Sequence, residues 1–217
     1  MDRGQGYTLE AVVAGMLLVG SLLFALQVTA VTPLSASTSS QHIENQQEAV
    51  AAGVLSTAAD DGSLEAAVLR WNPTDTNGDG EGQFHGAPTL SYYRGSANVT
   101  DFELGRQLRQ AYEGRGIVFN LHAVYLVDTD DDGDVDSTAR QRIVYRGEPS
   151  DNAVTASRTV TLFDDDVLYN DTDLDGVAEP TGDVLGNDTY VHDVTDSDGT
   201  DEAVYNAVKV VVVAWRQ

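Results

Sequence analysis

The stretch that decides the architecture is Ala11–Leu26, AVVAGMLLVGSLLFAL, in which every residue is apolar or small. No charged residue occurs from Ala11 to Gln41. A helix needs about 20 such residues to cross the hydrocarbon core of a bilayer, and the run reaches this length by extending to Leu34. Arg3 precedes it, and the next Lys or Arg is Arg70. This bias predicts a single membrane span with the amino terminus inside the cell and the rest of the chain outside.

Removal of this segment as a secretory signal is the competing interpretation. Small residues at Ser35–Ser37 would suit a cleavage site. The n-region of a signal peptide is clearly basic, whereas here Asp2 and Glu10 cancel Arg3. A retained segment is therefore favoured.

A helical pattern resumes after Pro33. Ile43, Val50, Val54 and Ala58 recur at near-heptad spacing, which predicts a helix. Asp60-Asp61-Gly62 marks its end, because Gly suits a left-handed cap. We therefore expect two regions: residues 1–62 as leader, transmembrane helix and helical stalk, and residues 63–217 as an outer head.

The residues directly before the apolar run, Arg3 to Glu10 (RGQGYTLE), resemble a prepilin signal. In the type IV pilin family a short leader ending in Gly is cut off, and the retained apolar helix packs in the core of a filament. The resemblance implies cleavage after Gly4, before Gln5, or after Gly6. It also implies that Glu10 pairs with the terminal amine of a neighbouring subunit, since a carboxylate in lipid is costly without a partner. A Glu that only fixes where the span starts is the plainer alternative.

The chain as a whole resembles a family of pilin-like proteins of halophilic archaea. The resemblance also includes Val144–Val154 (VYRGEPSDNAV) and the end Val212–Arg216 (VVAWR). It implies that the partners are other pilin-like subunits and the pilus assembly machinery.

The head is expected to be α+β, an antiparallel sheet with short helices. Ser63–Trp71 predicts a helix capped by Ser63. Thr100 and Glu103 have capping-box spacing for a second helix, which Gly114 or Gly116 ends. Strands are predicted at 117–127, with one buried face, at 140–146, forming a hairpin with it, at 157–163, and at 205–215 in a central position.

Composition excludes several functions. The chain of 217 residues has 12 Lys and Arg against 35 Asp and Glu, a net charge of -23, so nucleic acid is not an expected partner. Cysteine is absent, which removes disulfides and thiolate chemistry. The single lysine, Lys209, and the excess of Asp resemble proteins of organisms that live in saturated salt.

Catalytic motifs are not recognisable in the sequence. There is no G-x-S-x-G, no H-E-x-x-H and no phosphate-binding loop with Lys. The histidines, His42, His85, His122 and His192, are far apart in sequence. We expect no enzymatic activity.

Two acidic segments repeat the first half of a calcium loop, in which alternate carboxylates wrap one ion around a Gly turn. Each lacks the bidentate Glu at position twelve, so an EF-hand is excluded. Acidic turns without an ion are the alternative, because Asp and Gly favour turns. The candidate ligands are Asp128, Asp130, Asp132, Asp134 and Asp136 in the first segment, and Asp171, Asp173, Asp175 and Glu179 in the second. Asp75-x-Asn77-x-Asp79-Gly80 is a poorer third copy.

Three sites match the acceptor pattern for N-glycosylation, Asn98, Asn170 and Asn187. They suit an extracellular head. The sequence thus predicts a pilin-like, minor structural subunit of a surface filament or of its assembly system. A membrane-anchored extracellular binding module that never enters a filament is the alternative.

Overall fold

The computed structural model describes residues 3–72, 83–85, 87, 92–94, 98–112, 114–127, 135–170, 179–185 and 204–216, without the side chains of 3–5, 28–40, 72, 98, 101 and 170. The chain divides into two units, Met1–Asn45 and Gln46–Gln217. We call them the N-terminal unit and the compact unit, and each is described by itself. The compact unit begins at Gln46, earlier in the chain than the predicted head.

The first element, helix α1 (Arg3–Asp60), runs through Pro33 without ending. A proline inside a helix removes one hydrogen bond, and a helix can accommodate this loss. Within it, Gly6–Gln27 is long and apolar enough to cross a membrane, with a mean hydropathy of 2.2, and none of that stretch is buried. The predicted apolar helix is therefore confirmed.

The last part of α1 lies in the core of the compact unit and is helical as predicted, and Ala58 of the predicted stripe is fully buried. Ala51, Leu55 and Ala58 are fully buried, whereas Val50 and Val54 are half-buried beside them. The valines therefore flank a buried row formed by Ala51, Leu55 and Ala58. Gly62, with φ of 80°, follows the end of the helix, as predicted.

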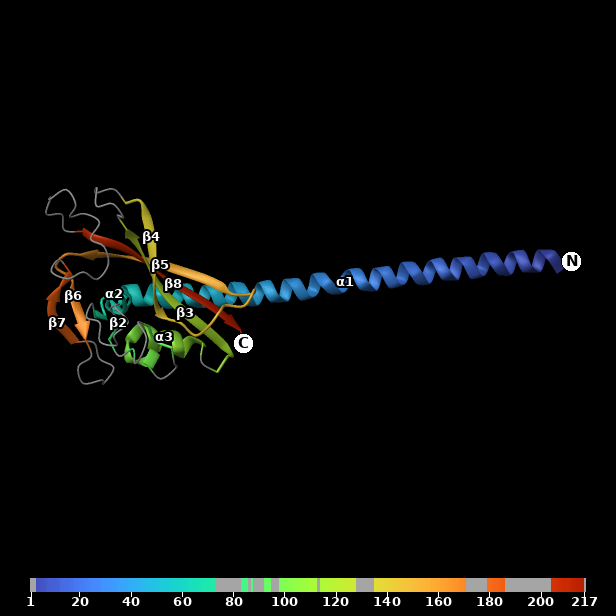
Figure 1. The fold of residues 1–217 in the computed structure, drawn as a ribbon. Helices are drawn as coiled ribbons and strands as arrows, with labels where there is room; N and C mark the ends of the chain where they lie inside the picture. Colours follow the sequence, from blue (N-terminus) through green and yellow to red (C-terminus); the bar gives the residue numbers. More distant parts are fainter. Residues whose placement is uncertain are drawn as a thin grey trace. The chain divides into compact units, whose positions relative to one another are not determined.

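Four antiparallel strands form the main sheet, in the order β4-β3-β8-β5 (Figure 1). Their bounds are Ser137–Val144 (β4), Ile117–Val127 (β3), Val204–Arg216 (β8) and Val154–Phe163 (β5). The predicted β3–β4 hairpin and the central place of the last strand are confirmed. β4 begins and ends earlier than predicted, and β5 begins earlier.

Strand β3 does not have the single buried face that alternation predicts, because residues Val118–Ala123 are all buried. Asn120 explains part of the difference. Its side-chain amide donates to the carbonyl of Gly147 (2.9 Å) and its oxygen accepts from the backbone N–H of Arg146 (2.8 Å). The segment after β4 therefore covers this end of the second face, and the buried polar side chain is satisfied.

Two short helices complete the larger elements, α2 (Ser63–Val68) and α3 (Glu103–Tyr112), the latter preceded by a 3₁₀ turn η1 (Asn98–Asp101). Both cap predictions were wrong. Gly62 occupies the N-cap of α2 without a side-chain bond. Glu103 begins α3, so it cannot be the fourth residue of a capping box that starts at Thr100.

Two small antiparallel sheets were not predicted. β1 (Trp71–Asn72) pairs with β2 (Gln83–Phe84), and β6 (Val167–Asn170) pairs with β7 (Glu179–Val184). The observed architecture, an apolar N-terminal helix followed by an antiparallel sheet with short helices, is α+β as predicted.

Candidate functional site

The apolar part of the N-terminal unit presents its large side chains to the outside. Met16, Leu17 and Phe24, for example, are about 70% exposed, and in the window Gly6–Gln27 the only charged residue is Glu10, itself exposed. Gly6 has open space around it. The exposure of Gly4 and the side chain of Gln5 are outside what the structure describes. Such a surface needs lipid or other apolar side chains around it.

Most of the predicted calcium ligands lie outside the described residues, namely Asp128, Asp130, Asp132, Asp134, Asp171, Asp173 and Asp175. Asp136 is exposed just before β4, and its backbone N–H donates to the carbonyl of Val127 (3.3 Å). Glu179 is exposed at the start of β7. In the described parts of the chain, no three His, Cys, Asp or Glu side chains are grouped so that they could hold a metal ion.

The predicted glycosylation sites are spread over the compact unit. Asn98 begins η1 and Asn170 ends β6. Asn187 lies outside the described residues, as do the Asp75–Gly80 segment and His192. The two glycosylation sites that the structure describes thus lie on different elements.

His122 in β3 is the one buried histidine among those described, with 6% of its surface exposed. Burial, and then the positive charges of Arg140 and Arg142, lower its pKa to about 4. Its Nδ1 atom has no hydrogen-bond partner. The imidazole is therefore neutral at physiological pH.

Strand register gathers cations on the face of the main sheet that bears His122. Arg142 lies opposite His122 and Arg140 lies opposite Val124, whose other neighbour is Lys209 of β8. Lys209 in turn lies opposite Thr159 of β5. Arg140, Arg142, Lys209 and Thr159 are all exposed. We call these four residues, with Thr138, Ser157 and Thr161 on the same face, the basic sheet face.

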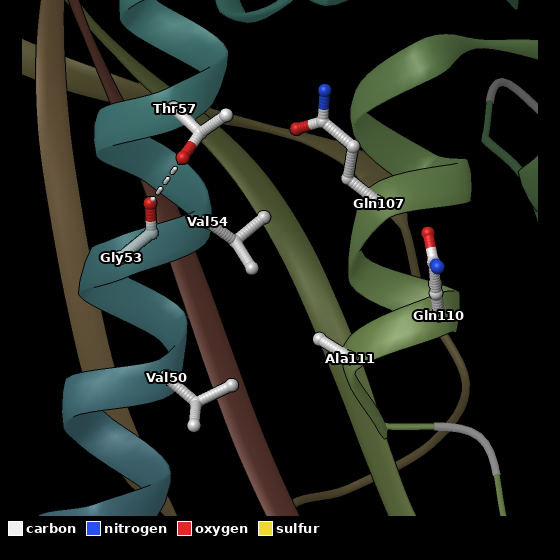
Figure 2. Close-up of a pocket in the computed structure, with 7 residues that line it drawn as sticks. All are labelled: Val50, Gly53, Val54, Thr57, Gln107, Gln110 and Ala111. Atoms are coloured by element: carbon white, nitrogen blue, oxygen red, sulfur yellow. Dashed lines mark hydrogen bonds between the residues drawn. The ribbon is translucent and has the colours of Figure 1, made fainter.

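A groove of about 510 Å³ lies between α1 and α3 in the compact unit (Figure 2). Figure 2 shows two valines of α1 and an alanine of α3 facing one another across it. Its lining is uncharged throughout and consists of Val50, Gly53, Val54, Thr57, Gln107, Gln110 and Ala111. The one hydroxyl in this lining, that of Thr57, donates to the Gly53 carbonyl of its own helix (3.1 Å).

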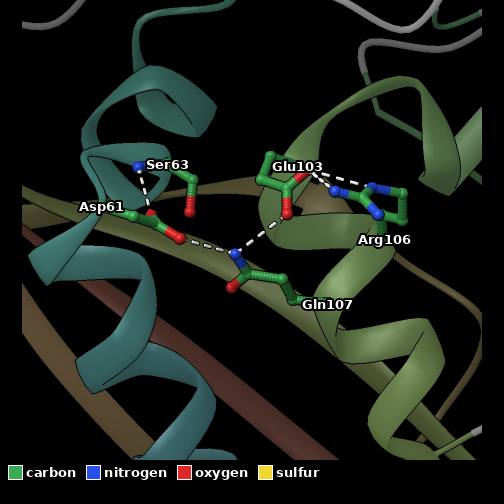
Figure 3. Close-up of polar contacts among 5 residues, drawn as sticks. All are labelled: Asp61, Ser63, Glu103, Arg106 and Gln107. Carbon is green, nitrogen blue, oxygen red and sulfur yellow. Dashed lines mark hydrogen bonds and ion pairs between the residues drawn. The ribbon is translucent and has the colours of Figure 1, made fainter.

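A polar junction closes one end of the two helices (Figure 3). The side-chain amide of Gln107 donates to Asp61 Oδ2 (2.8 Å) and to Glu103 Oε1 (3.1 Å), and Glu103 also pairs with Arg106. The Ser63 backbone N–H donates to Asp61 Oδ1 (2.9 Å), and hydrogen bonding by Ser63 lowers the pKa of this carboxyl. The junction joins the end of α1 to α3. Its polar side chains therefore have a structural role, which is to hold the two helices together.

Comparison with known proteins assigns the chain to one family. A family model described as a family of unknown function (DUF7288) matches residues 3–214, so the chain belongs to this family. The match includes the apolar helix and nearly the whole compact unit. No curated protein and no solved structure matches the chain.

Proposed function

We propose that this member of the DUF7288 family is a non-enzymatic, type IV pilin-like subunit of a surface filament or of its assembly system. It is anchored by its N-terminal helix, with the compact unit outside the cell. Processing after Gly4 or Gly6 gives the mature protein. Its partners are other pilin-like subunits and the assembly machinery.

The observation that carries this proposal is the apolar surface of Gly6–Gln27. Leucine, valine, methionine and phenylalanine side chains project from all sides of the helix and are more than half exposed. Burial of apolar surface is worth about 25 cal/mol per Å², so this helix is stable only in lipid or among similar helices. A filament subunit requires such a helix, because the helix lies first in lipid and then among the helices of other subunits.

Glu10 supports assembly over simple anchoring. It is the only charge in the apolar window, and a carboxylate in the hydrocarbon is costly unless it has a partner. The terminal amine of a second, processed subunit would be such a partner. In a plain anchor this carboxylate would only fix where the span starts, which the Glu10 variant below distinguishes from pairing.

The mass of the mature amino terminus tests retention of the helix. A terminus at Gln5 or Tyr7 is expected, from cleavage after Gly4 or Gly6. A mature protein that starts near Ser37 would show that the segment is a secretory signal, and the proposal would be wrong.

Replacement of Glu10 tests assembly. Glu10→Ala should leave the compact unit folded and lower cross-linking between apolar helices in the membrane. Glu44→Ala is the matched control, because Glu44 is a carboxylate of the same helix outside the apolar window. Equal cross-linking in the two variants would contradict a pairing role for Glu10. A protein that remains a monomer in membranes would instead favour the anchored binding module.

A further inference from the structure

Among the strand positions that the structure describes, the basic sheet face carries no acidic residue. Along β4, β3, β8 and β5, the positions that share this face around Arg140, Arg142 and Lys209 are Thr138, His122, Val124, Ala207, Val211, Thr155, Ser157, Thr159 and Thr161. The chain has 35 acidic residues against 12 basic ones. A sheet face with three cations and no carboxylate is therefore a local reversal of the charge of the whole molecule.

Among the described residues, these cations are not paired with carboxylates inside the chain. In the part of the chain that the structure describes, neither Arg140, Arg142 nor Lys209 forms an ion pair, whereas Arg106 of α3 pairs with Glu103. Cations that stabilised the fold by pairing would have carboxylates beside them. The structure leaves these three available to a partner.

Arg142 is held in position by aromatic rings. Its Cζ atom lies 4.1 Å from the centre of the Tyr145 ring and 5.7 Å from that of Tyr92, and Tyr145 donates a hydrogen bond to Glu148. Stacking on a ring leaves the N–H groups at the edge of the guanidinium free to bind a carboxylate. Because the side chain is already ordered, less conformational entropy is lost on binding.

We propose that the basic sheet face docks an acidic segment of a second copy of this chain. This inference rests on the proposed function and specifies how subunits would meet outside the membrane. The sequence supplies matching segments: Asp128–Asp136 and Asp193–Glu202 are rich in carboxylates and contain no Lys or Arg. Arginine binds carboxylates with two parallel hydrogen bonds, and the threonine and serine hydroxyls of the face add donors.

A contact of this kind joins two different parts of the chain. The surface that one copy contributes differs from the segment that the other contributes, so the contact can be reciprocal within a dimer or can continue from copy to copy. Heterologous contacts form rings or open filaments, whereas a two-fold contact ends at the dimer. Each exposed ion pair is weak, but subunits confined to one membrane meet at a high effective concentration.

Cross-linking in the full-length protein tests the proposal directly. Because the chain has no cysteine, Thr159→Cys can carry a single photoreactive maleimide on the basic sheet face. Gln110→Cys, on the exposed side of α3, is the matched control. Membranes containing equal amounts of isotopically light and heavy protein separate cross-links between copies from those within one copy.

The expected result is a light-to-heavy cross-link from position 159 to Asp128–Asp136 or to Asp193–Glu202, with none from position 110 to these segments. Cross-links only within one copy, or only to lipid, polysaccharide or another protein, would overturn the proposal. The cross-links form in the membrane itself, so a purified filament is not required.

A charge variant tests whether the three cations of the basic sheet face hold the acidic segment. Arg140→Gln, Arg142→Gln and Lys209→Gln together should lower the yield of this cross-link roughly tenfold, since three weak pairs are lost. Arg94→Gln, Arg106→Gln and Arg115→Gln change the net charge equally, at exposed positions outside this face, and should leave the yield unchanged. Equal loss in both variants would mean general repulsion and would contradict docking. Lys209→Gln alone covers the case in which the triple variant does not fold.

Failure of this inference is distinguishable from failure of the proposed function. If the processed terminus and the Glu10-dependent cross-links are found but position 159 gives no contact between copies, only the docking surface is wrong. If the helix is removed as a signal, the pilin-like proposal fails, whatever position 159 shows.

Discussion

The two parts of helix α1 reverse the usual relation between hydrophobicity and burial. In the N-terminal unit, Leu18, Leu22 and Phe24 are more than half exposed, whereas in the compact unit the smaller Ala51 and Ala58 are fully buried. In α1, a side chain is buried where neighbouring elements of the chain cover it, whatever its apolar character. The compact unit supplies its own partners from the sheet and α3, whereas the apolar side chains of the N-terminal unit are exposed.

The largest expected effect comes from replacing one leucine by alanine in each unit and comparing the two variants. Leu55→Ala should lower the free energy of unfolding of the compact unit by about 2–5 kcal/mol, because it leaves a cavity in the core. Leu22→Ala should leave that free energy unchanged. Fluorescence of Trp71 and Trp215, the two tryptophans of the chain, reports unfolding of the compact unit alone, since both are buried in it.

Acid should weaken the compact unit through His122. The unfolded histidine has a pKa of about 6.5 and the folded one about 4, so the unfolded chain binds the proton first. The stabilisation is complete above pH 6.5 and is lost as the pH falls towards 4, about 3 kcal/mol in all.

In His122→Leu this acid slope should disappear from the dependence of the melting temperature on pH. His42→Leu, at an exposed site of the N-terminal unit, should retain it. A parent slope that survives in His122→Leu would mean that another group is responsible.

Two helical glycines sharpen the comparison inside the compact unit. A Cβ atom at Gly105 would lie 2.0 Å from the carbonyl oxygen of Val99 and against the ring of Phe102, whereas Gly53 has nothing within 4 Å. Gly105→Ala should therefore cost about 1–3 kcal/mol by overpacking. Gly53→Ala should stabilise α1 by roughly 0.5–1 kcal/mol. Chemical denaturation of both variants measures the two signs, and a loss of stability in each would show that Gly53 also has a close contact.

The smallest expected effect is that of calcium. The segment Asp128–Asp136 joins β3 to β4, and calcium should offset the repulsion of its carboxylates with a dissociation constant of roughly 10⁻⁴ to 10⁻³ M. The melting temperature should rise by a few degrees at fixed ionic strength, and less with magnesium. The Asp130→Asn plus Asp132→Asn variant should show no rise. The same rise in parent and variant would leave the segment as an acidic turn.

Sequence patterns predicted the long helices and strands well. They did not predict the short strands, whose pairing depends on residues distant in sequence. β3 has the predicted bounds and β8 the predicted central position, because an alternating and a wholly apolar run of this length have few other solutions. β7 (EPTGDV) has no periodicity, and its pairing with β6 depends on tertiary contacts.

For the sites, Glu10 was visible as a charge in an apolar run. The basic sheet face was not visible in the sequence, although Arg140 and Arg142 are two residues apart and so lie on the same side of one strand. Lys209 joins them only because β3 lies between β4 and β8, and strand order cannot be read from local patterns.

The central position of β8 also has a consequence for the time course of biosynthesis. β3, β4 and β5 are all synthesised before β8, yet both β3 and β5 pair with it. Until β8 emerges, these two strands have open edges and no common sheet. The main sheet is therefore completed only after the last strand has been synthesised.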